Sequence, residues 1–114
     1  MVAEIGEQLA SLVIKDIQDV FSKGELIKTD DCIRDMIRCG LYEVDLQKVI
    51  MNATRIDKVM PASSPRASNP KNTHYVIYGD SSTGILVYCK ICTNYHPVTD
   101  AFVCWKLTSF CHSD

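Results

Sequence analysis

The sequence predicts an α+β domain in which N-terminal helices pack on one face of a roughly four-stranded antiparallel sheet. The first half of the chain has apolar residues at helical three-and-four spacing. The second half has short runs rich in β-branched and aromatic residues, joined by turn-forming segments. Helices followed by consecutive strands are typical of the α+β class.

The chain length fits a single domain spanning residues 1–114. Within it we expect an exposed loop over residues 61–73, which is rich in proline and serine, and a flexible tail over residues 108–114. No apolar run approaches the about 20 residues of a membrane-spanning helix. The first residues carry acids where a secretory signal has basic residues, so we expect a cytoplasmic protein.

Three helices are expected in the first half of the chain. The first covers about residues 2–21 and ends before Gly24, which can adopt the left-handed cap. The second is capped by Thr29 or Asp30 and stopped by Gly40. The third begins near residue 43. In the second helix we expect three apolar side chains to point inward: Ile33, Met36 and Ile37. We assign four charged residues to the solvent-facing sides of these helices: Arg34, Asp35, Arg38 and Lys48.

Strands are expected at residues 54–60 and 74–78, and a hairpin is expected from residues 84–92 and 101–107. The short segment 25–28 can be a strand or a turn. Odd-numbered hairpin residues are apolar and should face the core: Ile85, Val87, Cys89, Ile91, Val103, Trp105 and Leu107. The even-numbered residues Tyr88, Lys90 and Lys106 should then share the opposite surface. Ionisable groups on a half-buried strand are costly unless they are hydrated, paired or used.

The charge is distributed unevenly along the chain. Residues 1–54 carry six Lys/Arg and ten Asp/Glu, a net −4, whereas residues 55–106 carry six Lys/Arg and three Asp, a net +3; Asp114 completes the total of −2. This total argues against a strongly basic nucleic-acid binder. The positive sheet half can nevertheless attract an anionic substrate.

Six cysteines are most simply interpreted as buried thiols, because free cysteine packs as a small apolar residue. Cys92 and Cys104 share a face and leave an incidental disulfide open. A zinc site is a further alternative, built on Cys89, Cys92, Cys104 and either His96 or Cys111. It is disfavoured because residues three apart on a strand point to opposite faces. We expect no metal and no cofactor.

The chain from about Ile17 to Lys106 resembles the MqsR family of toxin–antitoxin ribonucleases, relatives of the RelE-type mRNA interferases. The resemblance rests on an ordered series of short elements: Gly24–Thr29, Gly40–Leu41 with Asp45, Val49–Ile50, Lys58–Met60, Val87–Lys90 and Val103–Lys106. It implies a RelE-like fold, an RNA substrate that can be bound on the ribosome, and a cognate antitoxin protein as partner.

The resemblance also implies a catalytic set of Lys58, Tyr88 and Lys106. A family glutamine on the strand after the long loop falls near His74 or Tyr75 in this chain. His74 can give and take a proton near neutral pH, so we add it as a catalytic or positioning candidate. As substrate-binding candidates we take Tyr75, for which Tyr78 is an alternative as a base-stacking residue, together with Lys90, Arg66 and Lys71.

Cleavage of the RelE type needs no metal, because the ribose 2′-hydroxyl attacks the adjacent phosphorus and side chains can move the protons. We expect Tyr88 to be the base or hydrogen-bond partner of the 2′-hydroxyl, and Lys58 and Lys106 to bind the phosphate and protonate the leaving group. The sequence leaves a second class open. In it the chain is a non-catalytic RelE-like module that binds or inhibits another protein, which the acidic helices, the altered glutamine position and the abundant cysteines favour.

Overall fold

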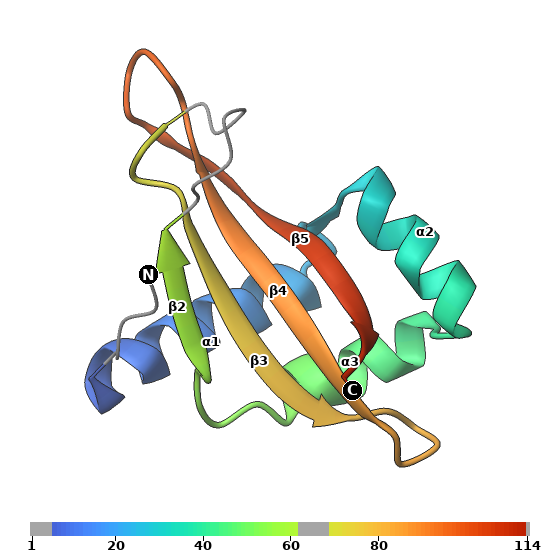
Figure 1. Ribbon diagram of the computed structural model, residues 1–114. Coiled ribbons are helices and arrows are strands. Elements are labelled where there is room, and N and C mark those ends of the chain that lie inside the picture. The colour runs from blue at the N-terminus through green and yellow to red at the C-terminus, as the bar shows by residue number, and fades with distance from the viewer. Residues whose placement is uncertain (1–5, 62–68, 114) are drawn as a thin grey trace.

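A computed structural model describes residues 6–61 and 69–113. Within them the chain forms three helices and five strands: α1 (Glu7–Ser22), β1 (Ile27–Lys28), α2 (Asp30–Cys39), α3 (Glu43–Met51), β2 (Lys58–Pro61), β3 (Thr73–Asp80), β4 (Leu86–Tyr95) and β5 (Phe102–His112). The strands form one sheet in the order β1-β5-β4-β3-β2 (Figure 1). β1 runs parallel to β5, and all other neighbours are antiparallel. The α+β class is confirmed, with five strands rather than four because the short segment before α2 adds β1 at an edge.

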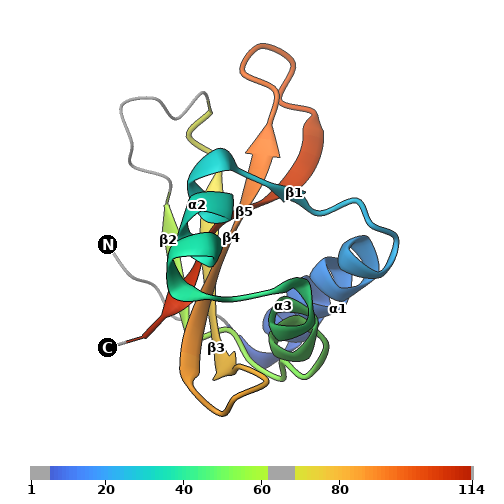
Figure 2. The ribbon, with the colours of Figure 1, turned by 90° about the vertical axis from the view of Figure 1, so that its right-hand side faces the viewer.

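The two faces of the sheet have different surroundings. α1 and α3 lie behind the sheet in Figure 1, and Figure 2 shows both on one side of it. α2 packs along the β5 edge. The core lies between the sheet and the helices, and its completely buried side chains include Ile17, Leu46, Ile50, Val87, Cys89, Ile91, Leu107 and Phe110. We call the other surface of β2 to β5 the open face, because no helix of the described residues covers it.

The start and end of α2 follow the predicted signals. The Thr29 side chain accepts a hydrogen bond from the Cys32 N–H, and Gly40 closes the helix in the left-handed conformation with φ 68°. The predicted inward face is partly wrong. Met36 is buried together with Cys32, but Ile33 and Ile37 are 43% and 75% exposed. Since α2 packs only against the edge of the sheet, it buries a narrow stripe and leaves its remaining apolar residues in solvent.

The β4–β5 hairpin is longer than predicted. The expected tail over 108–114 is wrong for most of its length, because β5 continues to His112 and Phe110 is completely buried. Ile91 pairs with Leu107 but Lys90 pairs with Ser109, so Thr108 is an extra residue that shifts the inward positions from odd to even numbers. Two residues expected in the core are exposed: Ile85 and Val103. Ile85 precedes β4, and Val103 lies at a second register shift.

The last residues of the segment between β2 and β3 are hydrogen-bonded to the β4–β5 hairpin. Asn69 and Asn72 are buried, so the expectation of an exposed loop over residues 61–73 is wrong at these two positions. The Asn69 Nδ2 donates to the His96 carbonyl oxygen at 3.0 Å, and the Asn72 Oδ1 accepts from the Tyr95 N–H at 2.8 Å. Residues 62–68 lie outside the described part of the chain.

The helices in the described ranges lack the combination of length and apolar character that crossing a bilayer requires.

Candidate functional site

Strand pairing arranges the polar residues of the open face in rows, because directly opposite residues share a face. One row runs from Lys58 through Val76 and Lys90 to Ser109. The rows on either side are His74, Cys92 and Lys106, and Tyr78, Tyr88 and Cys111. The register therefore supports the expectation that Tyr88, Lys90 and Lys106 occupy one surface.

A cavity of about 240 Å³ lies on this face toward its β2 edge. We call it the tyrosine cavity, and six residues of β2, β3 and β4 line it: Lys58, Met60, Val76, Tyr78, Tyr88 and Lys90. Lys58 and Lys90 are two strands apart in the same row, roughly 10 Å between backbones at the usual strand spacing. Two cations, two phenols and two apolar side chains therefore line a small space.

A second cavity of about 470 Å³ adjoins it where α2 meets the open face. We call it the arginine cavity, and its lining residues come from α2, β3, β4 and β5: Asp31, Arg34, Asp35, Arg38, His74, Lys90, Thr108 and Ser109. Lys90 borders both cavities. An extended ligand lying across Lys90 could contact both of them.

The lysines of the open face keep their charges available. In the described residues, no carboxylate forms an ion pair with Lys58, Lys90 or Lys106. The arginines of α2 differ, since Arg34 pairs with Asp31 and Arg38 contacts Asp35 at 2.5 Å. The electropositive character of the face therefore comes from the sheet rather than from the helix.

His74 lies half-buried beside this charge. Burial lowers the pKa of His74 below its usual 6.5, and the positive charge of Lys90 lowers it further. The imidazole is therefore mostly neutral at pH 7. A neutral imidazole can accept a proton, so His74 meets the electrostatic requirement for a general base.

Tyr88 is held by a hydrogen-bonded chain that leads to α2. The Ser109 Oγ lies 3.2 Å from the Tyr88 hydroxyl and donates to the Asp35 Oδ2 at 3.4 Å. In the Tyr88–Ser109 pair either hydroxyl can be the donor. The neighbouring Cys111 side chain raises the pKa of Tyr88, and burial and the charge of Asp35 add to this, whereas the Ser109 hydrogen bond opposes it. Tyr88 therefore stays protonated near neutral pH and is better suited to donate a proton than to abstract one.

Lys106 lies on the open face but borders neither cavity. It is three strands away from Lys58, which corresponds to roughly 14 Å or more between backbones. Both Lys106 and Lys90 act electrostatically on Cys92, although burial outweighs them and raises the pKa of that thiol to about 11. Lys90, rather than Lys106, is the lysine that shares a cavity with Lys58 and Tyr88.

Two predicted substrate-binding residues lie elsewhere, and a third is not among the described residues. Tyr75 packs on the helix-covered side, with its ring centroid 5.8 Å from that of Trp105. Lys71 pairs with Asp100 at 3.3 Å, next to the β4–β5 turn. Arg66 lies outside the described residues. Of the two tyrosines considered for stacking, Tyr78 is the one beside Lys58 and Lys90.

Sequence reasoning missed the contribution of α2. Arg34, Asp35 and Arg38 were assigned to solvent, and no local pattern distinguishes them from ordinary surface charges. They reach the open face because the parallel pairing of β1 with β5 brings the following helix to that edge. Met60 and Val76, by contrast, share the parity of Lys58 and His74 on their own strands, so strand alternation was a usable signal for them.

The cysteines do not converge on a metal. Cys89 is completely buried on the helix-covered side, and Cys92 lies on the open face in the row of His74. Across residues 6–61 and 69–113, no group of three or more His, Cys, Asp or Glu side chains is arranged to hold an ion. The zinc alternative therefore lacks a ligand set, and all six thiols are free.

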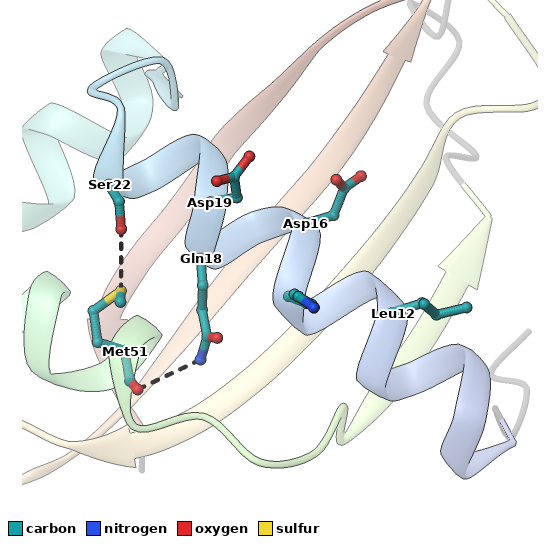
Figure 3. A pocket seen from close by; sticks show the side chains of 7 residues that line it. Leu12, Asp16, Gln18, Asp19, Ser22 and Met51 are labelled. Carbon is teal, nitrogen blue, oxygen red and sulfur yellow. Dashed lines mark hydrogen bonds between the residues drawn. The ribbon is translucent and has the colours of Figure 1, made fainter.

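A larger groove of about 550 Å³ runs along α1, and Figure 3 shows its lining residues. The Gln18 Nε2 donates to the carbonyl oxygens of Ile50 and Met51 at 3.0 and 3.4 Å, so it caps the end of α3. Ser22 donates to the Met51 sulfur in the same groove. These contacts join α1 to α3, which is a structural role, and the groove lies on the opposite side of the sheet from the row of lysines.

No protein-family model, curated protein or solved structure matches this chain.

Proposed function

We propose that this chain is the toxin of a toxin–antitoxin pair, a metal-independent endoribonuclease with a RelE-like fold that cleaves mRNA in the cytoplasm. The observation that supports it most directly is the shared cavity of Lys58, Tyr88 and Lys90, with His74 in the adjoining cavity across Lys90. Cations without a carboxylate partner attract the phosphate backbone of RNA. The neutral imidazole and the protonated phenol supply the base and the acid.

In the proposed reaction the ribose 2′-oxygen attacks the adjacent phosphorus and the bond from phosphorus to the 5′-oxygen breaks. The products are a 2′,3′-cyclic phosphate and a free 5′-hydroxyl. One proton leaves the 2′-hydroxyl, and one proton is delivered to the leaving 5′-oxygen. Negative charge develops on the non-bridging oxygens between these events, where positively charged side chains stabilise it.

We assign His74 as the base, since burial and Lys90 keep it neutral. Lys90 and Lys58 bind the phosphate and stabilise its developing charge. Tyr88, whose pKa is raised, donates the proton to the leaving group. Asp35 acts through Ser109 as a positioning residue that orients the Tyr88 hydroxyl. Lys106 contributes to the field of the open face rather than to the reacting phosphate.

The first test measures cleavage of a defined single-stranded RNA by the purified protein in EDTA, with and without ribosomes. We expect cyclic phosphate ends. Lys90→Met should reduce the rate by roughly 10²–10³-fold, because one charge that stabilises the transition state is lost. Lys15→Met is the matched control, because Lys15 is exposed on α1 behind the sheet. Absence of cleavage under both conditions, or an equal loss in the two variants, would refute the nuclease.

A second candidate function is a non-catalytic module that binds or inhibits another protein. It is favoured by the apolar side chains that α2 leaves in solvent beside the site, Ile33 and Ile37. Under this alternative, expression is harmless and the pure protein is inert on RNA. Under the nuclease proposal, expression arrests growth, and both co-expression of the cognate antitoxin and Lys58→Ala relieve the arrest.

A further inference from the structure

The tyrosine cavity contains more apolar surface than phosphate binding requires. Besides the two lysines, its lining consists of Val76, Met60 and the two phenol rings. Inorganic phosphate is best bound by cations and N–H groups alone. Apolar and aromatic surface between two cations indicates a ligand with a flat apolar part and anionic ends.

The size of the cavity limits that flat part. A volume of about 240 Å³ is below the about 300–1,000 Å³ typical of sites for whole cofactors or drug-sized ligands. One nucleobase is a ligand of suitable size. Single-stranded RNA is recognised mainly through unstacked bases placed on aromatic side chains, which fits a cavity open to solvent on a sheet surface.

The geometry of the two rings identifies the stacking residue. The centroids of Tyr78 and Tyr88 are 6.4 Å apart and the rings are tilted by 55°, so they do not stack flat on each other. The hydroxyl of Tyr88 is already engaged with Ser109, whereas no side-chain hydrogen bond involves the Tyr78 hydroxyl among the described residues. Tyr78 is therefore the ring that can contact a base without disturbing the hydrogen-bonded chain of Tyr88, Ser109 and Asp35.

The backbone under Tyr78 is held firmly. The Tyr78 N–H donates to the Asp57 Oδ2 at 3.0 Å, and Arg55 contacts the other oxygen of the same carboxylate at 2.6 Å. This contact joins the residue before β2 to β3, at the edge of the sheet where the cavity lies. A stacking platform on a fixed strand requires little ordering when a ligand binds.

We propose that the tyrosine cavity is a nucleobase subsite for single-stranded RNA, in which Tyr78 stacks on one base and Lys58 and Lys90 bind the phosphates on either side. The next nucleotide then lies in the arginine cavity, because Lys90 borders both spaces. This inference rests on the proposed function for the choice of a ribonucleotide. It adds a specificity-determining residue, Tyr78, that contacts the base and takes no part in proton transfer.

The test uses NMR titration of the full chain to compare the dissociation constants of uridine 3′-monophosphate, adenosine 3′-monophosphate and inorganic phosphate. A base subsite should make at least one nucleotide bind roughly five- to 150-fold more tightly than phosphate. Tyr78→Leu should abolish this difference without weakening phosphate binding, and Tyr78→Phe should retain it. Tyr42→Leu is the matched control, since Tyr42 is 70% exposed at the start of α3.

Equal binding of nucleotide and phosphate would show a plain anion site and overturn the inference, as would an unchanged preference in Tyr78→Leu. These outcomes are independent of catalysis, because nucleotide binding is measured without any cleavage. A protein that prefers nucleotides but never cleaves RNA would refute the nuclease and retain the subsite. If the Tyr78→Leu variant cleaves RNA as well as the wild type, the nuclease proposal is retained and the base subsite is refuted.

Discussion

On the helix-covered face of the sheet, Val87, Cys89 and Ile91 are completely buried, whereas the residues between them, Tyr88 and Lys90, line cavities on the open face. Consecutive residues of β4 therefore lie in different environments, the apolar core on one side and a solvent-accessible surface on the other. Burial on the first face raises the pKa of Cys89 well above its usual range. On the open face, charge remains hydrated and available. The covered face contributes mainly to stability, and the open face carries the candidate functional groups. Substitutions on the covered face should therefore lower the free energy of unfolding, whereas substitutions on the open face should change RNA binding or cleavage.

The largest loss of stability is expected from substitutions on the covered face. Phe110→Ala should lower the free energy of unfolding by about 3–5 kcal/mol, because it leaves a cavity at a completely buried ring. Urea denaturation measures it. Phe102→Ala is the matched control and should cost clearly less, since Phe102 is 47% exposed. Equal losses in the two variants would mean that the end of β5 is not part of the core.

An intermediate effect is expected at the buried Asp45, which joins α3 to the turn between β3 and β4. Its carboxylate accepts hydrogen bonds from the Ser82 hydroxyl at 2.6 Å, the Ser82 N–H at 2.8 Å and the Tyr42 N–H at 2.8 Å. Asp45→Asn should cost about 1.5–3 kcal/mol at pH 7. Asp19→Asn, on the exposed side of α1, should cost much less.

The pH dependence of this stabilisation follows from the lowered pKa of Asp45. The Ser82 hydroxyl is the main cause of the lowered pKa of Asp45, and the backbone N–H groups of Tyr42 and Ser82 assist it against the effect of burial. The stabilisation is therefore present above the unfolded-state pKa of about 3.9 and is lost as the pH falls through the lower folded-state value. The difference between wild type and Asp45→Asn should shrink below pH 4 in urea titrations. A difference that is constant down to pH 2 would contradict this.

The smallest effect on stability is expected on the open face. Lys58→Gln should change the free energy of unfolding by less than about 0.5 kcal/mol, because the side chain is exposed and forms no ion pair with a carboxylate of the described residues. It should instead reduce the slope of log binding constant against log salt for single-stranded RNA by about 0.7. Fluorescence anisotropy across a salt series measures this. Lys23→Gln, just after the end of α1, should leave the slope unchanged.

Much of the local structure was predictable from the chain. The cap at Thr29, the stop at Gly40 and the alternation of Val87, Tyr88, Cys89 and Lys90 depend on short-range sterics and hydrogen bonding. The predicted alternation was correct from Val87 to Ile91 and at Trp105 and Leu107, wrong at Ile85 and Val103, and changed phase after Leu107. The extra residue Thr108 is recognisable only from the pairing of two strands, so Phe110 was wrongly placed in a tail.

The sequence by itself determined which residues of β2, β3 and β4 share a face with Lys90, because side-chain direction along a strand is a property of the local backbone. Only the tertiary structure decided which of these residues are neighbours, and that α2 supplies Asp35, Arg34 and Arg38 to the same surface. Strand register and helix placement arise from the packing of segments far apart in the chain. Spacing along the sequence does not encode those distances, which is why it placed Lys90 and Lys106 on one surface but did not show that only Lys90 shares a cavity with Lys58.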